Sequence, residues 1–221
     1  MRPSGERTTV VAVHAWLDVA CPWCWIAKRR FEEATRDFEG EVEVTYHSWE
    51  LAPKLPADYL SSEVDFLQLL YAGTTPEEAQ QKCDLVRSTG AMLGLAYDFD
   101  RVQHTNTFLA HQLLHHAKDR GIQKPMLESL FSAFFERGLD LRSVDQLIEL
   151  AVGCGLDAGS VREGLVSGRY AEAVRADRVL ATQAGVTNIP TYVIAGGPPI
   201  HGAKRPAVLL AALREAATES R

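Results

Sequence analysis

Residues 18–34 read DVACPWCWIAKRRFEEA and place two cysteines, separated by Pro22 and Trp23, at the start of an amphipathic helix. Proline is preferred at the first position of a helix, and apolar side chains then recur every three or four residues. A Cys-x-x-Cys pair alone is compatible with a disulfide staple, half of a metal site, a lipid-attachment point or a redox dithiol. The rest of the chain has to distinguish these alternatives.

The flanking residues predict a β-α-β unit. Residues 9–17, TVVAVHAWL, are β-branched and apolar on both faces, which is typical of a strand in the middle of a covered parallel sheet. Residues 41–49, EVEVTYHSW, alternate in polarity as a second strand would. The dithiol therefore lies between a buried strand and a helix.

The middle of the chain is predicted to be helical, beginning with a capping box at Thr75 and Glu78. Further helices are expected before Gly121, Gly138 and Gly153 and over residues 157–167 and 169–184. Strands return at 191–195 and 198–203, and a helix covers 206–218. This order predicts an α/β fold with a β-α-β … β-β-α core and an all-helical insertion. We divide the chain into core residues 9–58, insertion 59–177 and core 178–218, with loosely held ends at 1–8 and 219–221.

Composition excludes several function classes. The 221 residues are 46% hydrophobic and 24% charged, as in an ordinary globular protein. There are 23 basic and 29 acidic side chains and no basic block, so we expect no nucleic-acid partner. No apolar run approaches the roughly 20 residues that cross a bilayer, so we expect no membrane span.

The other cysteines do not support a metal or lipid site. Cys83 and Cys154 are solitary, whereas a structural zinc site usually has a second closely spaced pair of ligands, so we expect no metal. Cys83 reads as a small core residue on its helix. Asp18 stands three positions before Cys21, where a lipoprotein signal needs an apolar residue. A free dithiol suits the reducing cytoplasm of a bacterium.

The position of the two thiols predicts their roles. The N-terminus of a helix favours negative charge and lowers the pKa of a thiol there. Cys21, at the cap, should be the more exposed and more acidic nucleophile, and Cys24 should resolve a mixed disulfide on Cys21. Asp18 is either a proton acceptor beside the dithiol or an ordinary loop or cap residue.

The sequence resembles the DsbA-like thioredoxin-fold oxidoreductases, specifically their FrnE-like branch. The resemblance rests on Asp18 with CPWC, WELAP at 49–53, Asn106, Thr107, Ala110 and His111, LFSAFFERGLDL at 130–141, and GVTNIPTYVI at 185–194. It implies a thioredoxin-like core with a helical insertion and a reversible Cys21–Cys24 disulfide that needs no bound cofactor. It also implies a cis bond between Ile189 and Pro190, in a loop against the dithiol.

The same resemblance suggests the substrates and their contacts. Protein or small-molecule thiols and disulfides are the expected partners, with glutathione as a candidate co-substrate and a monomer or homodimer as the assembly. The expected substrate-binding residues are Pro22, Trp23, Ile189, Pro190, Asp18 and Asn106. On spacing alone, Asn106, Thr107 and His111 are better interpreted as a helix cap and a solvated histidine than as a surface over the dithiol.

Two other functions compete with this interpretation. The 2-hydroxychromene-2-carboxylate isomerases and kappa-class glutathione transferases share the fold and act on small molecules. They usually have serine where Cys21 stands and lack the second cysteine, so the presence of both thiols favours redox chemistry. A chaperone-like or metal-binding module that uses the apolar surface around the dithiol is the least favoured reading.

Trp23 leads to a prediction about redox potential. Periplasmic DsbA enzymes have histidine at this position, and without it a positive charge that stabilises the thiolate is lost. We therefore expect a milder oxidant, and because about 30 mV corresponds to about 1.4 kcal/mol, one charge contact is enough to be measured. Equilibration with glutathione buffers will give the potential. A value as oxidising as that of the periplasmic enzymes would contradict the prediction.

Overall fold

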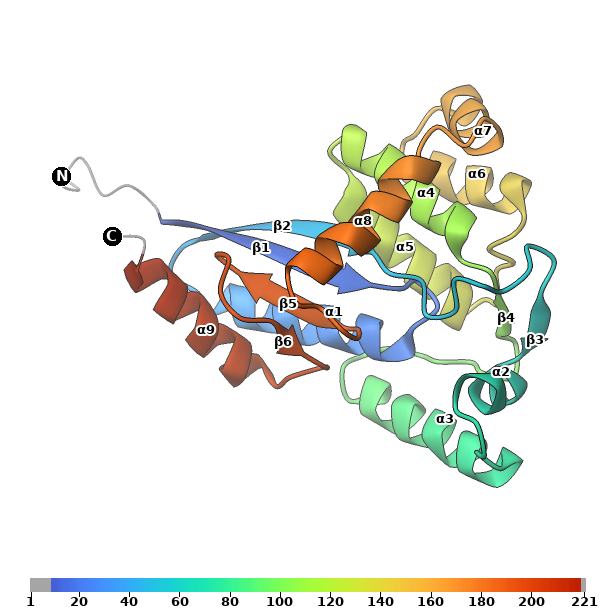
Figure 1. Ribbon diagram of the computed structural model, residues 1–221, viewed down its shortest axis with the longest axis horizontal. Coiled ribbons are helices and arrows are strands. Elements are labelled where there is room, and N and C mark those ends of the chain that lie inside the picture. The colour runs from blue at the N-terminus through green and yellow to red at the C-terminus, as the bar shows by residue number, and fades with distance from the viewer. Residues whose placement is uncertain (1–8, 220–221) are drawn as a thin grey trace.

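The computed structural model describes residues 9–219, and a four-stranded sheet lies at its centre (Figure 1). The expectation for residues 1–8, 220 and 221 lies outside this described part. Strand β1 is parallel to β2 and antiparallel to β5, which is antiparallel to β6. The sheet order is β2-β1-β5-β6, with β1 at Val10–Leu17, β2 at Glu41–Ser48, β5 at Thr191–Ile194 and β6 at Ile200–His201.

The expectation of a parallel sheet covered on both faces is therefore wrong in part. The sheet is mixed because the chain returns from the insertion and enters β5 in the opposite direction to β1. One face of β1 is fully covered, since Val11 and Val13 pack in the main core with α1 (Pro22–Arg36) and α9 (Pro206–Glu219). The other face is covered only near its end, where Trp16 packs against Ala181 of α8, while Val10 is 52% exposed.

The insertion is helical, as predicted, and consists of two groups of helices (Figure 1). One group gathers beyond the carboxyl ends of β1 and β2, and a smaller group lies beside the N-terminal end of α1. The first group comprises α4 (Phe108–Asp119), α5 (Gln123–Phe135), α6 (Val144–Gly153), α7 (Ala158–Val166) and α8 (Ala171–Gln183). The second comprises α2 (Glu63–Leu70) and α3 (Pro76–Ala91).

Local signals placed most of these helices correctly. The capping box of α3 is confirmed, because Glu78 N–H donates to Thr75 Oγ1 at 3.2 Å and Thr75 N–H donates to Glu78 Oε2 at 3.0 Å. Neither α2 nor the two-stranded antiparallel sheet formed by β3 (Leu60–Ser62) and β4 (Gln103–Thr105) was predicted, so the insertion is mainly rather than entirely helical.

One hydrophobic core joins the sheet to both groups of helices. Phe131 and Phe135 of α5 are fully buried and stack against Trp25 of α1, with ring centroids 5.8 and 6.0 Å apart. The division of the chain into core and insertion at 58/59 and 177/178 stays a prediction. Helix α8 crosses the second of these points and contacts both α4 and β2.

Gly90 controls how closely α3 approaches this core. A Cβ atom there would lie 2.3 Å from Cε2 of Tyr97, a buried ring packed against Trp25 and Phe135. We expect Gly90→Ala to lower the free energy of unfolding by about 1–3 kcal/mol, because the ring has no free space to move into.

Urea denaturation checks this prediction, with Gly153→Ala as the matched control. Gly153 is also helical, and a Cβ there meets nothing within 4 Å. The control should change stability by no more than about 1 kcal/mol, in the stabilising direction. Equal effects of the two substitutions would show that the approach of Tyr97 to Gly90 is not a packing constraint.

Candidate active site

The dithiol lies at the junction of β1 and α1. Cys21 is the N-cap of α1 with an extended backbone, and Pro22 is the first helical residue. Cys24 N–H donates to the Cys21 carbonyl at 2.9 Å, which closes the first turn. Both cysteines are free thiols. Cys21 is the more exposed, at 5% against 1%, and it lines a cavity to which Cys24 does not contribute.

The environment of Cys24 opposes its ionisation. Burial raises the pKa of this thiol well above its ordinary value, and the neighbouring Cys21 thiol and the charge of Asp18 raise it further. A single hydrogen bond from the backbone of Asp18 acts in the opposite direction. Cys24 therefore stays protonated at neutral pH unless a base removes its proton.

Asp18 is a buried carboxylate with several hydrogen bonds. Its Oδ2 accepts from Leu51 N–H at 2.7 Å, and its Oδ1 contacts Ala20 N at 3.3 Å and His111 Nε2 at 3.2 Å. Burial is the largest influence on its pKa and raises it, but the bond to His111, the charge of that ring and the two amides together lower the pKa below its usual value. Asp18 is therefore a buried loop residue, and its role as a proton acceptor stays a prediction.

His111 is not a solvated histidine, which corrects that expectation. Its side chain is fully buried because the face of α4 that carries Ala110 and Leu114 packs in the core. Asp18 is the polar partner it meets there, while Nδ1 of the ring has no hydrogen-bond partner within residues 9–219. The sequence signal was present in the spacing of α4, but it could not show which face is buried.

The structure separates Asn106 from the dithiol. Its Nδ2 donates to the Leu55 carbonyl at 2.8 Å, and its Oδ1 accepts from Phe108 N–H at 2.9 Å at the start of α4. It lines a different groove, together with Trp49 and Arg178. The local capping geometry is thus present, and a substrate contact at Asn106 stays a prediction.

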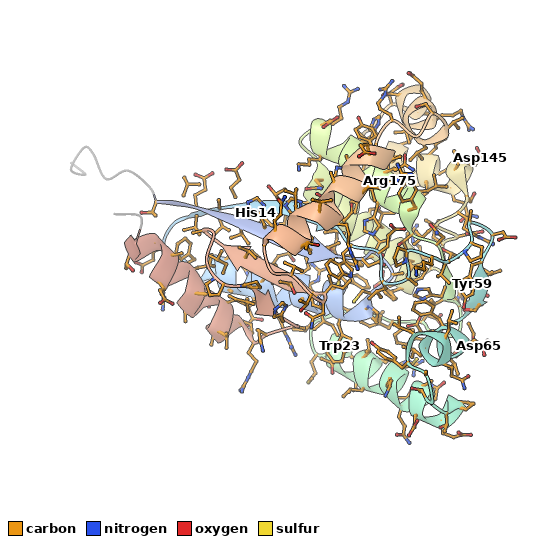
Figure 2. All side chains as sticks on the ribbon, in the orientation of Figure 1. His14, Trp23, Tyr59, Asp65, Asp145 and Arg175 are labelled. Carbon is orange, nitrogen blue, oxygen red and sulfur yellow. The ribbon has the colours of Figure 1, made fainter. Side chains whose placement is uncertain are left out.

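A cavity of about 460 Å³ lies over Cys21. Pro22, Trp23 and Ile189 form its wall on the core side, and Trp23 lies at the N-terminal end of α1 beside α3 (Figure 2). The opposite wall consists of α2 and α3, with Glu63, Phe66, Leu67, Leu70, Cys83, Leu85 and Val86. The sequence did not indicate the α2 residues, and Cys83 is buried as expected.

The loop before β5 completes the site. The Ile189–Pro190 peptide bond is cis. Ile189 lines the cavity, whereas Pro190 is buried and its carbonyl accepts from Gly202 N–H at 2.7 Å. The residues from opposite ends of the chain, Cys21 and Ile189, therefore share one cavity.

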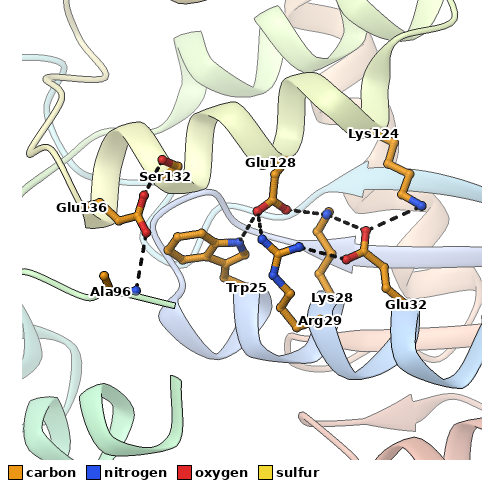
Figure 3. Close-up of polar contacts among 9 residues, drawn as sticks. All are labelled: Trp25, Lys28, Arg29, Glu32, Ala96, Lys124, Glu128, Ser132 and Glu136. Atoms are coloured by element: carbon orange, nitrogen blue, oxygen red, sulfur yellow. Dashed lines mark hydrogen bonds and ion pairs between the residues drawn. The ribbon is translucent and has the colours of Figure 1, made fainter. Parts of the chain in front are cut away.

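A partly buried ion-pair network links α1 to α5 (Figure 3). Lys28 is 2% exposed and contacts Glu32 at 2.8 Å and Glu128 at 2.5 Å. Glu128 also accepts from Trp25 Nε1 at 3.1 Å and pairs with Arg29. Because Trp25 directly follows Cys24, this network holds the dithiol in position relative to the insertion.

Tyr97 holds the first turn of α1 from the other side. Its hydroxyl donates to the Pro22 carbonyl at 2.7 Å, and its ring meets Trp25 edge-on at 5.4 Å.

Within residues 9–219, no helix is long and apolar enough to cross a membrane. The same residues contain no group of three or more side chains suited to hold a metal ion.

The site combines a strand, the Cys-x-x-Cys helix that follows it, and a cis-proline loop that leads into a neighbouring strand of the same sheet. This arrangement can be compared with known proteins. The DSBA-like thioredoxin domain family matches residues 12–214. The chain belongs to this family. This membership supports an enzyme of the oxidoreductase or isomerase type, and the resemblance to DsbA-like proteins is confirmed.

Individual relatives agree with this assignment. The crystal structure of a probable DsbA oxidoreductase from Streptomyces coelicolor is 37% identical, with a TM-score of 0.89 over 96% of this chain and 91% of that one. The uncharacterised protein YwbO of Bacillus subtilis is 28% identical over 83% of this chain and 86% of its own. A 2-hydroxychromene-2-carboxylate isomerase shares the fold at 15% identity and a TM-score of 0.69, over 95% and 97% of the two chains.

The buried Asp18 makes stability depend on pH. Its pKa is lowered in the folded state, so its contribution is present above its unfolded pKa of about 3.9 and is lost as the pH falls through the lower folded value. Asp18→Asn should lower the free energy of unfolding at pH 7 by about 1–3 kcal/mol, because an amide cannot accept all of these bonds. The difference from wild type should shrink below about pH 4.

Urea denaturation between pH 3 and 7 measures this difference. Asp100→Asn, at an exposed position, is the control and should stay close to wild type at every pH. A stability difference for Asp18→Asn that does not vary with pH would rule out a charged Asp18 as its source.

Proposed function

We propose that this protein is a thiol–disulfide oxidoreductase that cycles Cys21 and Cys24 through a mixed disulfide on Cys21. The observation that carries the proposal is the asymmetry of the two thiols. Cys21 faces a cavity from the N-terminus of α1, whereas Cys24 is buried, has a raised pKa and lies beside a buried carboxylate. An attacking thiol needs access to substrate, and a resolving thiol needs only to reach the mixed disulfide.

In the reducing direction, the Cys21 thiolate attacks one sulfur of a substrate disulfide. A bond forms between Cys21 and that sulfur, and the other substrate sulfur leaves as a thiolate. Cys24 then loses its proton and attacks Cys21, which releases the second substrate thiolate and forms the Cys21–Cys24 disulfide. Two electrons pass to the substrate, and the same steps in reverse oxidise a substrate dithiol.

Asp18 is assigned as the proton acceptor for Cys24, and His111 as the residue that positions Asp18. The charge of Asp18 acts directly on the Cys24 thiol, and the carboxylate is hydrogen-bonded to His111. The Asp18 carboxylate takes the proton as Cys24 attacks, with His111 holding the carboxylate in place. No bound cofactor is needed, and glutathione is a suitable co-substrate to reset the pair.

Pro22, Trp23 and Ile189 form the surface that a substrate meets beside Cys21. Their apolar side chains suit a protein or small-molecule substrate that carries an apolar group next to its sulfur. The scarcity of cysteines supports a reducing compartment, and we propose the bacterial cytoplasm.

Trapping a mixed disulfide tests the proposed function. In a Cys24→Ser variant the resolving step is blocked, so incubation with a disulfide-bonded protein should give a stable adduct on Cys21 that mass spectrometry can locate. Cys21→Ser is the control and should give no adduct. Failure to recover an adduct on Cys21 with generic disulfide-bonded protein substrates would refute the mixed-disulfide cycle.

An isomerase acting on small molecules is the second candidate, and the cavity is the observation in its favour. Its volume of about 460 Å³ is that of a small-molecule site. A Cys24→Ala variant separates the two functions, because an isomerase that uses one group at position 21 survives this change and a dithiol cycle does not. Assays of disulfide exchange and of 2-hydroxychromene-2-carboxylate isomerisation on this variant decide between them.

A further inference from the structure

A buried acid–base pair, which the dithiol cycle does not use, reaches the cavity over Cys21 through Glu63. Glu63 and His104 are only 3% and 2% exposed, and Glu63 Oε2 lies 3.1 Å from His104 Nδ1. An ionised carboxylate only accepts hydrogen bonds, so Nδ1 of His104 donates to it. Phe66 stacks on one face of the imidazole with a centroid separation of 3.2 Å, and Phe134 meets the ring edge-on at 6.0 Å.

The short sheet formed by β3 and β4 brings this pair together. Ser61 of β3 pairs with His104 of β4, and Glu63 follows at the first position of α2. Ser62 caps that helix, because its Oγ accepts a hydrogen bond from Asp65 N–H at 3.1 Å. The sheet and the cap together point Glu63 inward, toward the cavity that it lines.

Glu63 has unused hydrogen-bonding capacity at the cavity. Within residues 9–219, its carboxylate has one hydrogen-bond partner, His104. Carboxylates usually accept several hydrogen bonds, and a buried charge without them is costly. The oxygen that does not contact His104 is therefore available to a ligand in the cavity.

The other polar groups of the cavity do not satisfy Glu63. Lys82 and Tyr71 line its mouth and are exposed, and neither contacts the carboxylate. The charge of Glu63 nevertheless reaches across the cavity. Burial is the main cause that raises the pKa of Cys83 to about 11, and the charge of Glu63 is the second. Burial also raises the pKa of Tyr71, followed by the charges of Cys21 and Glu63.

We infer that Glu63 binds the ammonium group of a small aminothiol or its disulfide, whose sulfur is then presented to Cys21. This inference rests on the proposed function and names its substrate class. A cavity of about 460 Å³ accommodates a small molecule, and its apolar walls strengthen a charge-assisted hydrogen bond to Glu63. A hydroxyl of a neutral disulfide can donate a hydrogen bond but brings no positive charge to Glu63, and an anionic disulfide is repelled by it.

Three symmetrical disulfides of similar size test the inference: cystamine, 2-hydroxyethyl disulfide and 3,3′-dithiodipropionate. The reduced protein is oxidised by each, and kcat/KM is compared with the rate constant for the same disulfide and dithiothreitol. Relative to this reference, wild type should prefer cystamine to the neutral disulfide by about 10- to 100-fold, the value of one charge-assisted hydrogen bond. The anionic disulfide should react most slowly.

Substitutions identify the group responsible. Glu63→Gln keeps an acceptor for His104 but removes the charge, so it should abolish the preference for cystamine. Glu63→Asp retains the charge and should retain part of the preference. Glu77→Gln on the exposed first turn of α3 and Lys82→Gln at the mouth are controls and should keep it.

A second measurement uses the wild-type protein without any redox reaction. Pentylamine should slow the alkylation of Cys21 by iodoacetamide, and pentanol at the same concentration should not. Loss of this difference in Glu63→Gln supports the inference. If that variant does not fold, protection of the wild type by pentylamine alone supports it, and equal effects of amine and alcohol overturn it.

The outcomes distinguish this inference from the proposed function. Wild-type protein that reacts with all three disulfides at the reference ratios, or a Glu63→Gln variant that keeps the preference, overturns the role of Glu63 and leaves the dithiol cycle standing. Protein that reacts with none of them contradicts the dithiol cycle, and amine protection of Cys21 still reports on Glu63.

Discussion

A buried carboxylate beneath the dithiol is the constraint on which the arrangement of this protein depends. Asp18 directly follows β1 and is buried away from water, so the protein must supply the hydrogen-bond donors for its carboxylate. Two come from nearby backbone, at Ala20 and Leu51, and the third comes from His111 on α4. The last of these requires the insertion to lie against the end of β1.

A second buried carboxylate, on α8, is likewise held by histidines and a backbone amide. Asp177 of α8 contacts His47 of β2 at 2.7 Å and His115 of α4 at 3.0 Å, and it accepts from Ser48 N–H at 2.7 Å. Burial, its largest influence, raises its pKa, but these bonds outweigh burial and lower it. Helix α4 thus supplies a histidine to each carboxylate, one turn apart, and connects the dithiol turn, the sheet and α8.

Features that depend on neighbours in sequence could be predicted. The helix after Cys21 follows from Pro22 and the apolar spacing, and the start of α3 follows from Thr75 and Glu78. The direction of β5 could not be predicted in this way, since it depends on how a long insertion returns to the sheet. The burial of His111 depends on which face of α4 meets the core.

The same distinction separates the chemistry of the site from its selectivity. The order of the thiols and their position at a helix N-terminus are local properties, so the motif itself indicates which cysteine attacks and which resolves. The cavity that selects a substrate is formed by segments far apart in the chain: Trp23 from α1, Ile189 before β5, and Glu63, which is aligned by two strands of only three residues each. Strands that short carry almost no signal of their own, because their pairing is set by the packing of the helices around them. The walls of this cavity thus come from both the core and the insertion, so neither part of the chain alone determines its shape.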